Sequence, residues 1–124
     1  MTKRIVIVDD NAVIRRLLRN ILESAEESWV VCAEAADGRE GVRKIQESKP
    51  DVAILDFVMP VMNGLEVARV LTKTVPEVPL VLCTLHADAV LESEAVEAGI
   101  KKIVAKAENM QCLVNTVRSL LKNA

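Results

Sequence analysis

Three apolar runs of this sequence end on charged residues. The run 5–8 is followed by Asp9 and Asp10, the run 52–55 by Asp56, and the run 103–105 by Lys106. If these runs are neighbouring strands of a parallel sheet, their carboxylates and ammonium group meet at the carboxyl edge, where open α/β sheets bind ligands. Carboxylates beside an ammonium group suit a divalent cation and a phosphoryl group. The spacing therefore predicts a polar site at the ends of three strands.

The elements that would position these residues follow an alternating pattern. Short runs rich in Val, Ile and Leu predict strands at 4–9, 29–35, 52–56, 79–84 and 102–105. Helices are predicted to begin near residues 11, 38, 64, 87 and 109. Two helices show a clear apolar stripe, formed by Ile14, Leu17, Leu18, Ile21 and Leu22 in the first and by Met110, Leu113, Val114, Val117 and Leu121 in the last. Strands that alternate with helices indicate βαβ units and a parallel sheet.

Composition limits the class of protein. The 124 residues predict one domain over 1–124, since domains usually have roughly 100–200 residues. Hydrophobic residues make up 51% and aromatic residues only 2%, so aliphatic side chains must form the core, as in strands covered by helices on both faces. The net charge of −2 provides no basic field for a polyanion. Direct binding of nucleic acid by this chain is therefore not expected.

The cysteines and the hydropathy pattern bear on the compartment. Cys32, Cys83 and Cys112 are an odd number, and two of them lie in apolar strand-like runs, which favours small buried side chains over a disulfide framework. The first apolar run is too short for the core of a signal peptide. No run approaches the roughly 18 apolar residues of a membrane span. These observations predict a cytoplasmic protein.

Further residues complete a pattern around the charged strand ends. Met59-Pro60 and Asn63-Gly64 follow Asp56, and Thr84 ends the fourth strand-like run. With these residues in this order, the chain resembles the receiver domain of bacterial two-component response regulators over essentially its whole length. The resemblance implies a doubly wound, flavodoxin-like (βα)5 fold. Its five parallel strands would have the order 2-1-3-4-5.

The resemblance also implies a role for each site residue. Asp56 would accept the phosphoryl group, and Thr84 and Lys106 would contact its oxygens. Magnesium would be bound by Asp10, Asp56 and the backbone carbonyl of Val58, with Asp9 acting through water. A carboxylate is ionised at neutral pH, so Asp56 needs no general base to act as a nucleophile. The chain would catalyse at most its own phosphorylation from small donors and its own dephosphorylation.

Each of these residues alone also has an ordinary structural explanation. An aspartate such as Asp56 is common at turns, and Asp10 or Asn11 can cap the first helix. Thr84 suits a strand, and Lys106 suits a surface. Asn63-Gly64 is interpreted as shaping the loop, with a permissive glycine easing the bend. His86, the only histidine, is interpreted as a solvent-facing loop residue, so that the donor histidine comes from a partner kinase.

Four positions bear on how this chain departs from the usual receiver pattern. Ile103 stands where receivers usually have an aromatic residue that changes rotamer on phosphorylation. Leu85 replaces a small residue, and Val58 has no polar group to orient water, which together motivate the hypothesis of slow self-dephosphorylation. Ala107 stands where proline is common. Because a non-proline cis bond costs about 2.5–4 kcal/mol, the Lys106–Ala107 bond is predicted to be trans.

The leading functional prediction is a switch controlled by phosphorylation. A sensor histidine kinase or phosphotransfer protein would phosphorylate Asp56, and the face of the fourth helix, fifth strand and fifth helix would change its preference for an output domain or downstream protein. Analogy favours the N-terminal part of a DNA-binding transcriptional regulator over a stand-alone receiver, and a homodimer is conceivable. An aspartyl-phosphate phosphatase would need an acid where Val58 stands. A flavin binder would need small residues in place of Asp9-Asp10.

Overall fold

The structure, a computed structural model, describes residues 2–85, 87–106 and 110–122. These residues form β1 (Lys3–Val8), α1 (Ala12–Ala25), β2 (Trp29–Ala35), α2 (Gly38–Ser48), β3 (Val52–Asp56), α3 (Gly64–Thr74), β4 (Leu80–Thr84), α4 (Ala89–Ala98), β5 (Lys102–Ala105) and α5 (Met110–Lys122). All strands are parallel and lie in the order β2-β1-β3-β4-β5. The predicted fold class and strand order are therefore confirmed.

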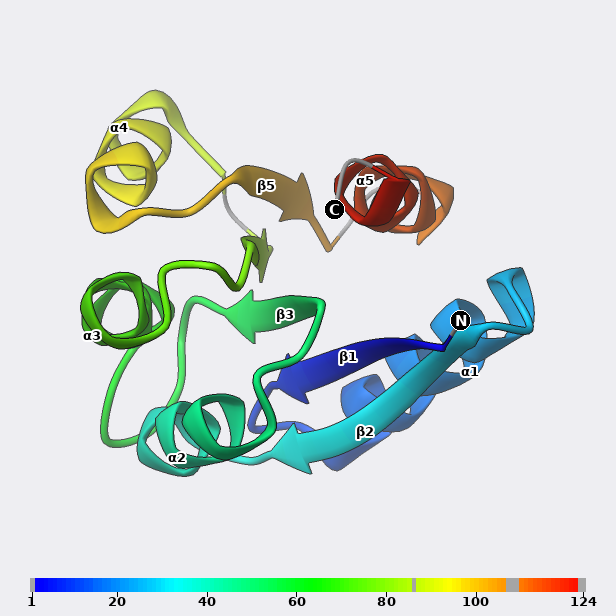
Figure 1. Cartoon of the computed structure of the whole chain (residues 1–124). Coiled ribbons are helices and arrows are strands. Elements are labelled where there is room, and N and C mark those ends of the chain that lie inside the picture. The colour runs from blue at the N-terminus through cyan, green and yellow to red at the C-terminus, as the bar shows by residue number, and fades with distance from the viewer. Residues whose placement is uncertain (1, 86, 107–109, 123–124) are drawn as a thin grey trace.

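Helices cover both faces of the sheet (Figure 1). The alternation along β3 shows why: Ala53 and Leu55 pack toward α2, α3 and α4, whereas Val52 and Ile54 pack toward α1 and α5. Every residue of β3 and β4 is buried. Such strands read as continuous apolar runs, which is why the sequence pattern located them well. Their carboxyl ends are consequently held in place by core packing on both sides.

The apolar stripes predicted for the first and last helices are buried to different extents. In α5 the predicted residues Leu113, Val114, Val117 and Leu121 are all buried. In α1 the helix buries Leu18 and Leu22, but Leu17 remains 46% exposed. The helical period places Leu17 on the same stripe, yet it lies outside both buried clusters. Leu17 instead borders the cavity described below.

The cysteine prediction is partly wrong. All three cysteines are free, but only Cys83 is buried, while Cys32 and Cys112 are exposed. Cys32 lies where the β1–β2 register shifts, between Val31 opposite Ile5 and Ala33 opposite Val6. This extra residue turns outward, as expected of a β-bulge. Burial raises the pKa of the Cys83 thiol to about 11, so this group stays protonated at neutral pH.

None of the helices among the described residues is long and apolar enough to cross a lipid bilayer.

Candidate functional site

Asp9 and Asp10 lie directly after β1, but their side chains differ in environment. Asp9 is 2% exposed, whereas Asp10 is exposed to solvent. The N-cap of α1 is Asn11, whose side-chain oxygen accepts hydrogen bonds from the backbone N–H groups of Val13 at 2.9 Å and Ile14 at 3.2 Å. Of the two predicted caps, Asn11 therefore takes the role. The Asp10 carboxylate is left to face the site.

Asp56 is the last residue of β3, and Lys106 follows β5 from two strands away. Lys106 Nζ lies 2.7 Å from Asp9 Oδ2 and 3.1 Å from Asp56 Oδ1. The Asp56 side chain is 10% exposed and that of Lys106 is 13% exposed. Residues that are 97 positions apart in the chain thus meet in one hydrogen-bonded ion pair. The predicted convergence of the strand ends is observed.

The electrostatics of this cluster are set by burial and by the neighbouring charges. Burial, and next the charge of Asp9, raise the pKa of the Asp56 carboxyl above its usual value, and Lys106 opposes the rise only in part. Burial would lower the pKa of Lys106, but hydrogen bonds to Asp9 and Asp56 outweigh it and raise that pKa. The lysine is therefore held charged, and the oxygens of Asp56 are more basic than those of an ordinary aspartate.

Asp9, Asp10 and Asp56 each place one carboxylate oxygen within 4.8 Å of those of the other two. Such spacing leaves room for one cation between them. Hard oxygen ligands, with one of the three side chains exposed to water, suit a small divalent ion that keeps part of its hydration shell, as Mg²⁺ does. The donor set therefore fits the expected metal.

A cavity of about 760 Å³ opens over the cluster. Thr84 and Val58, the two other predicted site residues, both line it, as does Leu85. Thr84 is 3% exposed, while Val58 and Leu85 are 71% and 61% exposed. The backbone of Thr84 is tied to the lysine, because its carbonyl accepts a 2.7 Å hydrogen bond from the Lys106 N–H. The cavity thus has an acidic floor and an apolar rim.

The loop after Asp56 is shaped differently from the prediction. Asn63 forms a capping box with Glu66 at the start of α3. A Cβ on Gly64 would lie 2.4 Å from the backbone oxygen of Asp56, so the glycine permits close approach of α3 to Asp56. The bend itself falls on Val61, a β-branched residue with a φ of 73°. Easing of the bend is therefore not the role of Gly64.

Several residues near the site were not predicted from the sequence. Leu17 and Leu91 add to the apolar rim of the cavity. Arg15 reaches the backbone of Asp9, to whose carbonyl its Nη1 donates a 2.7 Å hydrogen bond. The one feature of the sequence that could have indicated this contact is the place of Arg15 on the first helix, six residues after Asp9. His86, the Lys106–Ala107 bond and the start of the last helix at Asn109 lie outside the described residues.

Comparison with known proteins agrees with this geometry. The family described as response regulator receiver domain matches residues 5–118. The chemotaxis protein CheY of Thermotoga maritima is 37% identical over 106 residues, which are 86% of this chain and 87% of that protein. The transcriptional regulatory protein LnrK of Bacillus subtilis is 32% identical over 94% of this chain but only 53% of its own length. The shared part is thus most of the protein in one relative and about half of it in the other.

Solved structures give the same result. A two-component response regulator of the LuxR family from Aurantimonas sp. SI85-9A1 superposes with a TM-score of 0.93 at 29% identity, covering 99% of this chain and 87% of that one. The response regulator domain of Thermotoga maritima CheB superposes with a TM-score of 0.90 at 26% identity, covering 98% of both chains. Sequence, fold and site therefore agree, and this chain belongs to the response regulator receiver domain family.

Proposed function

We propose that residues 1–124 form one receiver domain that accepts a phosphoryl group on Asp56 from a sensor histidine kinase or a phosphotransfer protein. The observation that supports this most is the ion pair of Lys106 with Asp56 and Asp9 on the floor of the cavity. A charged lysine beside a basic carboxylate provides the nucleophile and a cation to meet the transferred oxygens in one place. A phosphatase is less well supported, because Val58 supplies no acid.

In the proposed reaction, a carboxylate oxygen of Asp56 attacks the phosphorus atom of a phosphohistidine. The new O–P bond forms as the P–N bond breaks, and the electron pair of that bond returns to the imidazole nitrogen, which then takes a proton from solvent. Asp56 needs no base, because it reacts as the anion. The burial that raises its pKa also makes its oxygens more basic.

Asp9, Asp10, Asp56 and the Val58 carbonyl are the residues proposed to hold Mg²⁺. The bound ion would neutralise charge between the carboxylates and the transferring oxygens. Lys106, now shared between Asp9 and Asp56, would move part of its contact to a phosphoryl oxygen. The Thr84 hydroxyl would donate to another oxygen, and its backbone link to Lys106 couples the two movements.

The proposed partners use two different surfaces. The apolar rim beside Asp56 would receive the phosphodonor, and the face formed by α4, β5 and α5 would bind an output domain, a downstream protein or a second copy of the chain. The LnrK and LuxR-family relatives favour the N-terminal part of a DNA-binding regulator, whereas CheY favours a stand-alone receiver as the alternative. The proposed compartment is the cytoplasm, in keeping with the family.

The proposal is tested by intact-protein mass spectrometry after incubation with acetyl phosphate and Mg²⁺. We expect one phosphoryl adduct on the wild type and none on Asp56→Asn, which keeps the side-chain shape but cannot form an acyl phosphate. Asp37→Asn is the matched control, because Asp37 caps α2 away from the cavity and asparagine is an equally good N-cap. An adduct that persists on Asp56→Asn, or its absence from the wild type, would contradict the proposal.

A further inference from the structure

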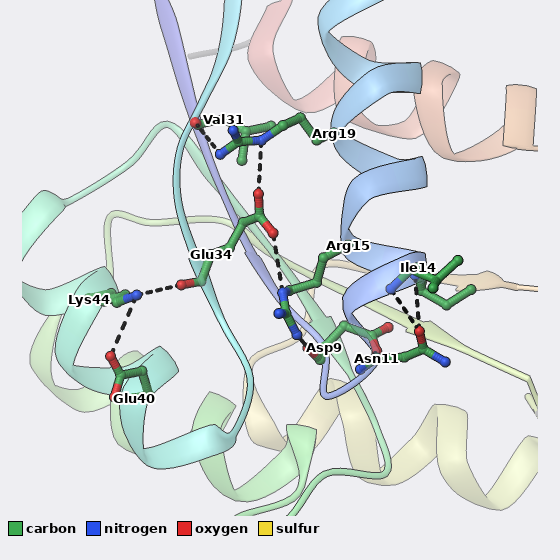
Figure 2. Close-up of polar contacts among 10 residues, drawn as sticks. Asp9, Asn11, Ile14, Arg15, Arg19, Val31, Glu34, Glu40 and Lys44 are labelled. Carbon is green, nitrogen blue, oxygen red and sulfur yellow. Dashed lines mark hydrogen bonds and ion pairs between the residues drawn. The ribbon is translucent and has the colours of Figure 1, made fainter.

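The guanidinium group of Arg15 lies behind the metal-binding end of the site. Its Nη1 donates to the backbone carbonyl of Asp9 at 2.7 Å, and its Nε lies 3.2 Å from Oε1 of Glu34 on β2 (Figure 2). The Arg15 side chain is only 18% exposed. One side chain therefore connects the start of the β1–α1 loop to the neighbouring strand.

Glu34 is itself held from several sides. Its second carboxylate oxygen, Oε2, lies 2.8 Å from Arg19 Nε, and its backbone carbonyl accepts a 2.6 Å hydrogen bond from Lys44 Nζ (Figure 2). Two arginines of α1 thus share one carboxylate, while α2 holds the backbone of the same residue. This arrangement gives Arg15 a fixed anchor, in contrast to a pair of mobile surface charges.

The β-bulge at Cys32 explains why Glu34 faces α1. Before the bulge, Val31 packs on the α1 side of the sheet, and a regular strand would place Ala33 and Ala35 there too. The extra residue reverses the alternation, so that Ala33 and Ala35 pack on the opposite face. Glu34, opposite Ile7, consequently points toward α1. The irregularity of β2 brings this carboxylate to Arg15.

Arg15 holds the backbone carbonyl of Asp9, whereas the other partners of Asp9 described below hold its N–H group and its carboxylate. The Asp9 N–H donates to the Ala35 carbonyl at 3.0 Å, and its carboxylate is held by the Asn11 N–H at 2.9 Å and by Lys106. The Asp9 carbonyl begins the peptide unit that leads to Asp10, and Arg15 fixes its direction. Because Asp10 is exposed and gains little support from packing, the orientation of this peptide decides where its carboxylate lies.

We propose that Arg15, braced by Glu34, is a positioning residue for divalent-cation binding by Asp9 and Asp10. This inference rests on the proposed function, in which these carboxylates hold the metal. Two effects of removing Arg15 have opposite signs. Loss of a nearby positive charge alone would strengthen Mg²⁺ binding, whereas loss of the orienting hydrogen bond weakens it. Outer contacts of metal ligands typically contribute about 10–100-fold to metal affinity, so the weakening prevails.

The test measures the Kd of Mg²⁺ by isothermal titration calorimetry for the wild type, Arg15→Ala and Glu34→Gln. We expect Arg15→Ala to bind Mg²⁺ about 10-fold more weakly, and Glu34→Gln to lose less because Arg15 can still reach Asp9. Arg16→Ala is the matched control, since it removes the same charge from an exposed neighbour on α1. Urea unfolding identifies the conditions in which each variant is folded.

A second readout separates positioning from general damage. In phosphorylation by acetyl phosphate, Arg15→Ala should need about 10-fold more Mg²⁺ for half of its maximal rate. The rate at saturating Mg²⁺ should change little, because Arg15 has no contact with Asp56 or Lys106 among the described interactions. If Arg15→Ala does not fold, Arg15→Lys decides the question, since a single amine cannot keep both contacts of the guanidinium group.

Each outcome has a defined meaning. Unchanged or tighter Mg²⁺ binding by folded Arg15→Ala, or by Arg15→Lys in its place, would overturn the inference, as would an equal loss in Arg16→Ala. Asp10→Asn is the reference for loss of a ligand. If the wild type binds Mg²⁺ and Asp10→Asn does not, a failure in the arginine variants concerns Arg15 alone. If the wild type binds no Mg²⁺, the proposed function fails together with the inference.

Discussion

The Asp56 carboxylate should lower the stability of the folded chain as long as no cation is bound. Asp56 is 8% exposed, and burial followed by the charge of Asp9 raises its pKa in the folded state. A carboxyl whose pKa is higher in the folded than in the unfolded chain is ionised at a cost when the protein folds. Replacing Asp56 by asparagine removes this cost, while Lys106 keeps its 2.7 Å contact with Asp9.

The size of the effect follows from the opposing contributions. At an effective dielectric constant of about 20, the 3.1 Å pair with Lys106 contributes roughly 5 kcal/mol, and repulsion from Asp9 within 4.8 Å costs at least roughly 3 kcal/mol. The net attraction left for the Asp56 charge is therefore at most roughly 2 kcal/mol. Because the pKa of Asp56 is raised, the cost of desolvating this charge must be larger than that net attraction. We therefore expect Asp56→Asn to be more stable than the wild type at pH 7, and each gain of about 1 kcal/mol would raise Tm by about 4 °C.

The pH dependence has a definite sign. The cost of ionised Asp56 is fully present above its folded-state pKa and disappears as the pH falls toward the unfolded value of 3.8. The advantage of Asp56→Asn should therefore be largest near neutral pH and shrink in acid. Mg²⁺ should reduce the stability advantage of Asp56→Asn over the wild type. A ligand present at ten times its Kd stabilises the folded wild type by about 1.4 kcal/mol. Asp56→Asn lacks one of the three carboxylates proposed to bind the ion and should gain less.

The assay is urea unfolding in EDTA and in Mg²⁺, followed by the fluorescence of Trp29. This residue is the single tryptophan and is 6% exposed, so unfolding changes its environment. Asp37→Asn is the control, because it removes a carboxylate from an N-cap without affecting the cluster. A lower stability of Asp56→Asn than of the wild type in EDTA at pH 7 would refute the reasoning, since the Lys106 ion pair would then outweigh desolvation.

Three further predictions concern the loops around the cavity. Gly64→Ala should destabilise the chain by about 1–3 kcal/mol in urea unfolding and slow phosphorylation, because its Cβ would displace the backbone of Asp56; unaltered kinetics would contradict this. Val61→Asn should stabilise by about 1 kcal/mol in the same assay by relieving a left-handed β-branched residue, and Val61→Ile should not. Val58→Asn and Leu85→Ala should shorten the half-life of the phosphorylated protein, by up to about tenfold if one hydrogen bond orients the attacking water. Equal half-lives would end the hypothesis of slow self-dephosphorylation.

The fold could be predicted from the sequence because its central strands are buried on both faces. Their runs of Val, Ile and Leu end at Asp9 and Asp56, and the structure places these ends within a residue of the predicted bounds. Parallel strands bring such ends to one edge whatever the loops do. The convergence of the carboxylates was therefore accessible from spacing. Their meeting with Lys106, which follows a strand two places from β3, also needed the strand order that the resemblance implied.

The features that were missed depend on contacts between elements, which spacing does not encode. Glu34 meets Arg15 only because a bulge changes the face of β2 on which it lies, and nothing in the local composition marks that bulge. Leu17 has the helical spacing of a core residue, but it is half-exposed and lines the cavity. The role of Gly64 is a close approach to Asp56, which becomes visible only once α3 is placed against β3.

The strands that carry the site residues differ in how deeply they are buried. This difference indicates how a phosphoryl group on Asp56 would act on the rest of the domain. Asp9 directly follows β1 and Asp56 ends β3, both inside the sheet, and the residues of these strands nearest the site are all buried. Lys106 instead follows β5, an edge strand of four residues of which only Val104 is buried. If the lysine were to shift toward a phosphoryl oxygen on Asp56, β5 is the element that could move with it. Ile103 on β5 is half-buried against the core that includes α4, so we expect the displacement to reach the α4–β5 face without an aromatic switch.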